Sequence, residues 1–341
     1  MLYFWRRSFA ARVIEAAYAP PSTFLDHFSG MVSEQGSKGA GDSKVWVVPK
    51  PNAVNEVPMH DGASVVIRRH GNPEGPRLIL SHGNGLAIDL YFPFWSLFLD
   101  DFDVIVFDLR NHGWNPVGDF KNHTLPSFAQ DFDPIISAID RHYGTKPSVG
   151  IFHSVSALAA LQPFCKPDLF SALVLYDPPL CKGGRGYAEF EAAANRLSEL
   201  TRMRTNKFAT KDSLAEILPY LPSFQRVVPG VYELLAETTL RESKDDKGYE
   251  LCCPPKYEAR IMEFSGNFAV LVDFEHIRCP VKVLGADPTL PYSYLPTFDL
   301  GYVVKIDYDF LPESTHLLQL EQPEKCAEAV VEFLKAHNLM S

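Results

Sequence analysis

Three side chains in this sequence have the chemistry needed for nucleophilic acyl transfer. Ser154 follows an apolar run at 148–153 and precedes a helix-favouring run. Asp287 comes just after an apolar run at 281–285, and His316 lies in a short loop before an amphipathic C-terminal segment. A serine hydroxyl is a weak nucleophile at neutral pH, so it needs a base within hydrogen-bond reach and a carboxylate that orients the base. We therefore predict Ser154 as nucleophile, His316 as base and Asp287 as acid.

Two of these roles have a second candidate. Asp177 ends the apolar run at 172–176 and opens an Asp-Pro-Pro turn, which makes it an alternative acid. Ser156 is an alternative nucleophile, but it lies further into the predicted helix, and Leu158 then stands where a tight turn favours a small residue. We favour Ser154 over Ser156 and Asp287 over Asp177.

Short apolar runs alternate with helical patterns along most of the chain. The runs lie at 64–69, 77–81, 103–108, 148–153, 172–177, 281–285 and 302–307. Such runs separated by helices are typical of a mostly parallel sheet covered on both faces. We predict a doubly wound α/β core formed by residues 46–180 and 277–341.

One long segment at 181–276 interrupts this alternation. It is helical in pattern, punctuated by prolines and rich in aromatic residues. We predict that it forms a helical subdomain. Most of its aromatic side chains are expected to build the core of that subdomain, and a few are expected to line an apolar pocket.

The order serine, aspartate, histidine, the strand-turn-helix setting of Ser154 and the histidine loop together resemble the α/β-hydrolase superfamily over residues 60–338. The resemblance implies an α/β-hydrolase fold in which 181–276 is a helical cap inserted after the sixth strand. The turn at Ser154 departs from the family's G-x-S-x-G signature, because Phe152 and Ser156 replace its two glycines. Phe152 is therefore expected to reshape the turn or to fill part of the pocket.

The resemblance also implies where a developing oxyanion is held. The run Leu-Ser-His-Gly-Asn-Gly at 80–85 resembles the family's His-Gly loop, so the backbone N–H groups of Asn84 and Val155 are the expected donors. His82 and the run Asp-Leu-Arg-Asn-His-Gly at 108–113 are interpreted as braces for the loops after two strands.

The function implied by the resemblance is that of a serine hydrolase with a Ser-Asp-His triad. Carboxylic esters of small to medium hydrophobic compounds are the first expectation for its substrate. Lactone, thioester and carbon–carbon bond hydrolysis use the same triad and stay open as alternatives. A non-catalytic ligand-binding protein or a lyase on the same scaffold is the alternative from another class. The serine at the turn argues against hydrolases that attack through a carboxylate.

Composition excludes several other classes of function. A net charge of −10 and a pI near 5.6 over 341 residues argue against a nucleic-acid partner. No metal-binding or phosphate-binding motif occurs in a suitable context, so neither a metal nor a cofactor is expected. The six cysteines lack CxxC spacing, which favours reduced thiols and a cytoplasmic location.

Residues 1–45 are predicted to be an appendage made of a helix at 2–18 and a linker at 36–44. Its arginines follow the first aromatic residues, an order that argues against a signal peptide. No apolar run reaches the ~18 residues of a membrane span. We expect the arm to pack on the body or on a second subunit, so a homodimer through the arm or the cap is an expectation. A membrane-peripheral or organellar location is the alternative for the arm.

Overall fold

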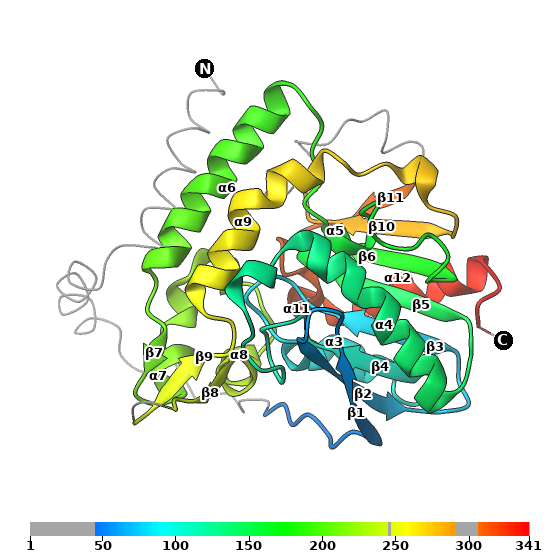
Figure 1. Cartoon of the computed structure of the whole chain (residues 1–341), viewed down its shortest axis with the longest axis horizontal. Coiled ribbons are helices and arrows are strands. Elements are labelled where there is room, and N and C mark those ends of the chain that lie inside the picture. The colour runs from blue at the N-terminus through cyan, green and yellow to red at the C-terminus, as the bar shows by residue number, and fades with distance from the viewer. Residues whose placement is uncertain (1–44, 245–246, 291–305, 341) are drawn as a thin grey trace.

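The computed structural model describes residues 45–244, 247–290 and 306–340. At its centre lies an eight-stranded sheet with the strand order β1-β2-β4-β3-β5-β6-β10-β11 (Figure 1). The strands are β1 (Ala53–Pro58), β2 (Ser64–Gly71), β3 (Arg77–Ser81), β4 (Asp103–Phe107), β5 (Ser148–His153), β6 (Ala172–Tyr176), β10 (Val281–Gly285) and β11 (Asp307–Phe310). Strand β2 pairs antiparallel with β1 and β4, and every other neighbouring pair is parallel. The predicted mostly parallel α/β sheet is confirmed.

Helices cover both faces of this sheet. The α-helices are α3 (Phe92–Trp95), α4 (Leu125–Tyr143), α5 (Val155–Ala160), α6 (Arg185–Met203), α7 (Asp212–Ala215), α8 (Val231–Thr239), α9 (Pro255–Ala269), α11 (Leu318–Glu321) and α12 (Pro323–Ala336). Short 3₁₀ turns are η1 (Ile88–Tyr91), η2 (Ser96–Phe98), η3 (Phe120–Asn122), η4 (Leu218–Tyr220), η5 (Pro222–Phe224) and η6 (Phe274–His276). Helices α3 and α12 contribute to one hydrophobic cluster, and helices α4 and α5 contribute to the other.

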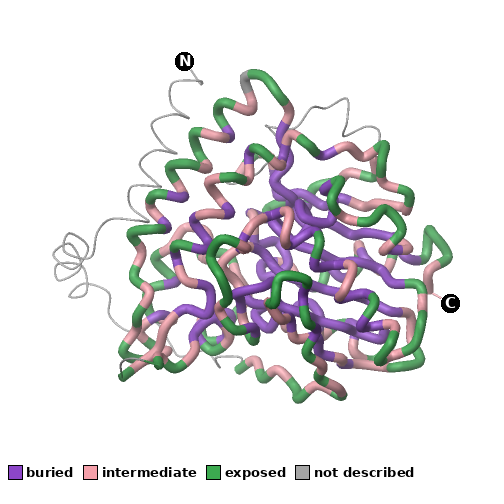
Figure 2. Tube along the Cα trace, viewed as in Figure 1, coloured by how far each residue is buried: buried purple, intermediate pink, exposed green. Residues whose placement is uncertain are grey.

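The central strands are buried because they are covered on both sides. Every residue of β3, β4, β5 and β6 is buried, as expected for parallel strands between two helical layers. In β3, Leu78 and Leu80 belong to the cluster with α12, while Ile79 between them belongs to the cluster with α4. Figure 2 shows the buried residues concentrated along these strands.

Two strands differ from the prediction. Strand β1 was not predicted, because its burial alternates along the sequence and it therefore lacks a continuous apolar run. The last strand was predicted at 302–307, but the structure places β11 at Asp307–Phe310, and residues 291–305 lie outside the described part. The predicted N-terminal helix and linker also lie outside it.

The segment 181–276, called the cap segment below, lies between β6 and β10 in the chain. Its helices α6 and α9 run side by side next to the large sheet (Figure 1). A small sheet with the order β7-β9-β8 was not predicted. Its strands are β7 (Lys207–Phe208), β8 (Leu240–Glu242) and β9 (Tyr249–Leu251). Within the described residues, no helix is both long enough and apolar enough to cross a membrane.

Candidate active site

Ser154 occupies a sharp turn between β5 and α5. Its backbone has φ 54° and ψ −115°, a conformation that serine rarely adopts and that strand-to-helix turns impose on an exposed nucleophile. The backbone N–H of Ser154 donates to the carbonyl of Tyr176 at 2.9 Å, which ties the turn to the end of β6. Ser154 therefore lies at the carboxyl end of the central strands, as its position after the apolar run at 148–153 predicts.

Ser154, His316 and Asp177 form a continuous hydrogen-bonded chain. His316 Nε2 lies 3.0 Å from Ser154 Oγ, and His316 Nδ1 lies 2.6 Å from Asp177 Oδ2. The other carboxylate oxygen of Asp177 accepts from the backbone N–H of Ala286 at 3.1 Å. With Nδ1–H donating to Asp177, the neutral imidazole presents the lone pair of Nε2 to the serine hydroxyl.

The structure corrects the position of the acid, because it does not bring Asp287 to His316. Asp287 Oδ1 accepts from the backbone N–H and the hydroxyl of Thr289 at 2.8 and 2.6 Å. Its Oδ2 accepts from the N–H of Glu313 at 2.9 Å. These bonds, that of the Thr289 hydroxyl foremost, lower the pKa of Asp287. Asp287 thus braces the loops around β10 and β11, while the alternative acid Asp177 contacts the histidine.

His316 stands in the loop between β11 and α11. Beside it, Thr315 donates its backbone N–H to Glu321 Oε2 at 2.8 Å, and its hydroxyl bonds to the other oxygen of that carboxyl group. Gln322 Nε2 donates to Ser314 Oγ at 2.6 Å. These bonds connect the loop to α11 and to Gln322, the residue before α12, and so position the imidazole.

Ser156 braces the turn from within. Its hydroxyl donates to the carbonyl of His153 at 2.8 Å and accepts from the backbone N–H of His153 at 3.0 Å. Both functions of the hydroxyl are therefore engaged, and the side chain is fully buried. The geometry leaves Ser154 as the nucleophile candidate.

Phe152 points into the core and does not fill a pocket at the serine. Its ring packs against Phe107, Phe132 and Phe170 in the cluster beneath α4. Gly150 provides the space, because a Cβ at that position would lie 2.5 Å from the ring. This orientation could have been predicted from the sequence, because Gly150 lies two residues before Phe152 and therefore on the same face of the strand.

The predicted oxyanion donors lie next to the nucleophile. A Cβ on Gly83 would lie 3.3 Å from Ser154 Cβ, so the loop at 80–85 that contains Asn84, called the oxyanion loop below, runs directly beside the serine. Val155 opens α5, where an N–H has no carbonyl partner within the helix. In the described part of the chain, no protein group accepts the backbone N–H of Asn84. Both amides can therefore donate to a bound oxyanion.

The core side of this loop is held by a relay of hydrogen bonds. The N–H of Gly83 donates to Tyr91 Oη at 3.2 Å, and the Tyr91 hydroxyl lies 2.7 Å from His153 Nδ1. His153 Nε2 lies 2.8 Å from the carbonyl of His316. Since a carbonyl only accepts, His153 carries its proton on Nε2 and accepts from Tyr91 at Nδ1. The relay joins the oxyanion loop to the backbone of His316, and Tyr91 had no signal in the sequence.

The cap segment holds the other side of the loop. Asn84 Nδ2 donates to the carbonyl of Glu258 in α9 at 2.9 Å. The Glu258 carboxylate is buried, forms an ion pair with Arg204, and lies so close to Gly85 that a Cβ there would overlap it. Gly85 has φ 74°, which also favours glycine. The oxyanion loop is therefore packed between the core and α9.

Comparison with known proteins agrees with this arrangement. The model of the Alpha/beta hydrolase family matches residues 78–329. The chain belongs to the alpha/beta hydrolase family. No curated protein sequence matches this chain.

Solved structures of similar fold include three hydrolytic enzymes. E-2-(acetamidomethylene)succinate hydrolase has 17% identity and a TM-score of 0.64, with 83% of this chain and 99% of that chain covered. The thioesterase domain from the curacin biosynthetic pathway has 16% identity and a TM-score of 0.62, with 82% and 100% covered. A thermophilic esterase from Thermogutta terrifontis has 19% identity and a TM-score of 0.56, with 85% and 100% covered. These likenesses show the fold.

The buried histidines near the oxyanion loop, His82, His112 and His153, are neutral and have structural roles. Burial lowers the pKa of His82 to about 4 and that of His112 to about 3. His82 Nε2 accepts from the N–H of Leu109 at 3.0 Å, and His112 Nε2 accepts from the N–H of Gly85 at 3.1 Å. Burial and the nearby His316 also lower the pKa of His153. Protonation of an accepting nitrogen would break its bond, so these rings are structural, as predicted for His82.

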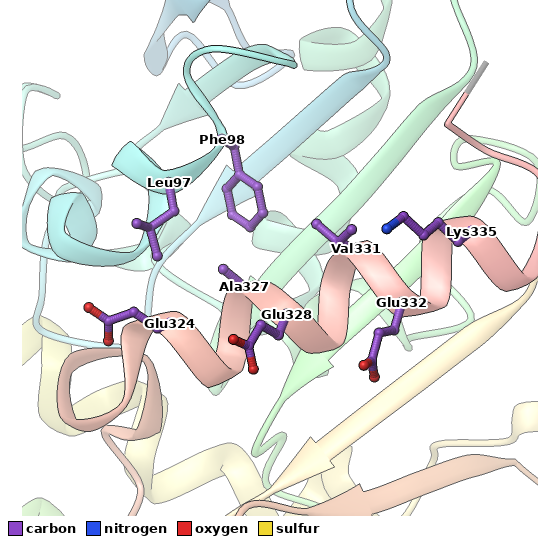
Figure 3. Close-up of a pocket in the computed structure, with 8 residues that line it drawn as sticks. All are labelled: Leu97, Phe98, Glu324, Ala327, Glu328, Val331, Glu332 and Lys335. Carbon is purple, nitrogen blue, oxygen red and sulfur yellow. The ribbon is translucent and has the colours of Figure 1, made fainter.

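Ser154 itself is buried, with 8% of its surface exposed. An open groove lies elsewhere, along α12, where Leu97 and Phe98 face Val331 (Figure 3). It contains no triad residue. In the described residues, no group of histidine, cysteine, aspartate and glutamate side chains is arranged to hold a metal ion.

Proposed function

We propose that this protein is a serine hydrolase that cleaves carboxylic esters of small to medium hydrophobic compounds through an acyl-enzyme. The observation that carries the proposal is the continuous chain from Ser154 Oγ through His316 to Asp177. Its setting supports the proposal, because Ser154 lies in a turn with positive φ, directly before Val155, and the loop that contains Asn84 runs beside it. A buried serine without such a setting would have no means of activation.

The first half of the reaction forms the acyl-enzyme. His316 Nε2 takes the proton of Ser154 while Oγ attacks the ester carbonyl, and the Asn84 and Val155 amides hold the oxyanion. Asp177 stabilises the imidazolium that results. When the tetrahedral intermediate collapses, His316 gives its proton to the leaving alkoxide and the alcohol departs.

The second half releases the acid. His316 removes a proton from water, the hydroxide attacks the acyl carbonyl, and the same amides hold the second oxyanion. Collapse of this intermediate breaks the bond to Ser154 Oγ, which recovers its proton from His316. No cofactor is needed for any of these steps.

Esters are proposed as substrates because the surroundings of Ser154 suit an uncharged compound. The chain is acidic overall, the serine is largely buried, and the cap segment is rich in aromatic side chains. Lactones, thioesters and carbon–carbon bonds are the competing substrates, since the same triad attacks each of them. A ligand-binding protein or a lyase remains the competing class.

The test is covalent labelling with a fluorophosphonate probe, paired with turnover of p-nitrophenyl esters from acetate to decanoate. We expect the wild-type protein to be labelled and active, and Ser154→Ala to lose both properties. Ser137→Ala is the matched control, because Ser137 is exposed on α4 and away from the triad. If the folded wild-type protein takes no label, the proposal is wrong and the binding-protein or lyase class is favoured.

A further inference from the structure

A groove that contains no triad residue opens between the first turn of α4 and the cap helix α9. Its volume is about 240 Å³. Ile261, Phe264 and Phe268 give it an apolar wall, and Phe264 remains 43% exposed. His123 and Arg260 also line it, so the groove combines an apolar surface with donors and positive charge.

His123 brings a hydrogen-bond donor that has no acceptor in the described part of the chain. Asn111 Oδ1 accepts from the N–H of Gly118 at 2.6 Å, which turns Nδ2 toward His123 Nδ1 at 2.8 Å. His123 Nδ1 is therefore an acceptor, and the neutral ring carries its proton on Nε2. That Nε2 is buried and has no hydrogen-bond partner among the described residues. An unsatisfied buried donor costs about 1–3 kcal/mol, which an acceptor on a ligand would relieve.

Arg260 and the start of α4 make the groove favourable for negative charge. Arg260 Nη1 donates to the carbonyl of Phe120 at 2.8 Å, and the guanidinium stacks over the Phe120 ring at 4.7 Å. Within the described residues, no carboxylate pairs with Arg260. The first turn of α4 contains no acidic residue, so no carboxylate in that turn neutralises the partial positive charge at the helix N-terminus.

We propose that this groove binds a monocarboxylate with a short or medium apolar chain. The carboxylate lies beside the Arg260 guanidinium. A small shift of the groove wall lets it accept from the Nε2–H of His123, which is fully buried in this structure. The chain covers Phe264 and Phe268, whose exposed surface would otherwise contact water. Ser154 takes no part in this binding, so the site is independent of the proposed hydrolysis.

Octanoate titrated into full-length Ser154→Ala protein by isothermal titration calorimetry tests the proposal. We expect saturable binding whose Kd rises at least about tenfold in Ser154→Ala combined with Arg260→Gln or with His123→Phe. The phenylalanine keeps a ring at position 123 and removes the donor. Arg278→Gln is the matched control, since it removes an equal charge from an exposed arginine paired with Asp168 and should leave the Kd unchanged. Octanol, which has the same chain without the charge, should bind at least about tenfold more weakly.

Several results would overturn the proposal. They are no saturable binding at millimolar octanoate, equal Kd values for the Arg260 and Arg278 variants, and equal binding of octanol. Circular dichroism reports whether His123→Phe is folded. If His123→Phe is not folded, the Kd of the Arg260→Gln variant alone tests the proposal, because the Arg260 side chain is partly exposed and its removal leaves the core intact.

Discussion

At the scale of single residues, Asp177 and Asp287 follow the neighbouring parallel strands β6 and β10, yet of the two only Asp177 contacts His316. We expect Asp177→Asn to lower kcat by about 10³- to 10⁴-fold, because the amide cannot hold the imidazole in the tautomer that accepts from Ser154. Asp287→Asn should retain most of kcat and lose stability, since Asp287 braces two loops. Esterase kinetics and thermal melting of both variants measure this difference. The reverse pattern would return the acid role to Asp287.

The same pair of residues shows where prediction from sequence ends. Ser154 and His316 have distinctive local settings, a strand before a small-residue helix and a loop before an amphipathic helix. The two aspartates have similar settings, because each follows a mostly apolar strand of the large sheet and precedes a proline. What separates them is the backbone of Asp177, which has φ 38° and turns its carboxylate toward the histidine. The contact of Asp177 with His316 joins residues 139 positions apart and leaves no local pattern in the sequence, and the same applies to the contact of Glu258 with Asn84.

At the scale of elements, the oxyanion loop packs against α9 at Gly85. We expect Gly85→Ala to lower kcat by about 10²-fold, because the added methyl overlaps the Glu258 carboxylate and displaces a loop that carries one oxyanion donor. Gly144→Ala is the matched control: Gly144 also has positive φ, 83°, but a Cβ there meets no atom within 4 Å. It should cost about 1–3 kcal/mol of stability and leave kcat unchanged. Equal kcat values for the two variants would contradict a role for the α9 contact.

Elements with strong periodic patterns were predictable, and short ones were not. The buried strands of the large sheet are apolar on both faces, so their sequence alone marks them. Strand β1 is half exposed, and β7, β8 and β9 contain only two or three residues each, too few to establish a period. The small sheet of the cap segment forms because its strands pair with each other, and this pairing cannot be predicted from the sequence of any one strand.

At the scale of the whole molecule, buried neutral histidines make stability depend on pH. Burial lowers the pKa of His70, His82, His112, His123 and His153 below the ordinary value of 6.5. Above that value these rings are neutral in both states, and their contribution is complete. As pH falls from 6.5 toward 4, the unfolded chain binds protons that the folded protein excludes. Stability then decreases by up to about 1.4 kcal/mol per histidine and pH unit.

Urea unfolding at pH 7 and pH 5 measures this dependence. His70→Phe provides the internal comparison, because His70 is buried against Trp95 at the far side of the sheet order from the triad. The variant should lose about 2 kcal/mol of the difference in unfolding free energy between pH 7 and pH 5, because the imidazole of His70 binds a proton over that range in the unfolded chain only. An unchanged difference would show that folding does not lower the pKa of His70.

The contact between Asn84 and α9 also has a consequence for attempts to change substrate preference. Replacing the cap segment by that of another protein is one way to change the pocket while keeping the rest of the fold. Here the cap segment supplies the carbonyl that accepts from the side chain of Asn84, so a chimera that replaces α9 also changes a contact that positions the proposed oxyanion donor. Recombination boundaries placed after Glu258 would keep that anchor, and the more distant turns of α9 could then be exchanged.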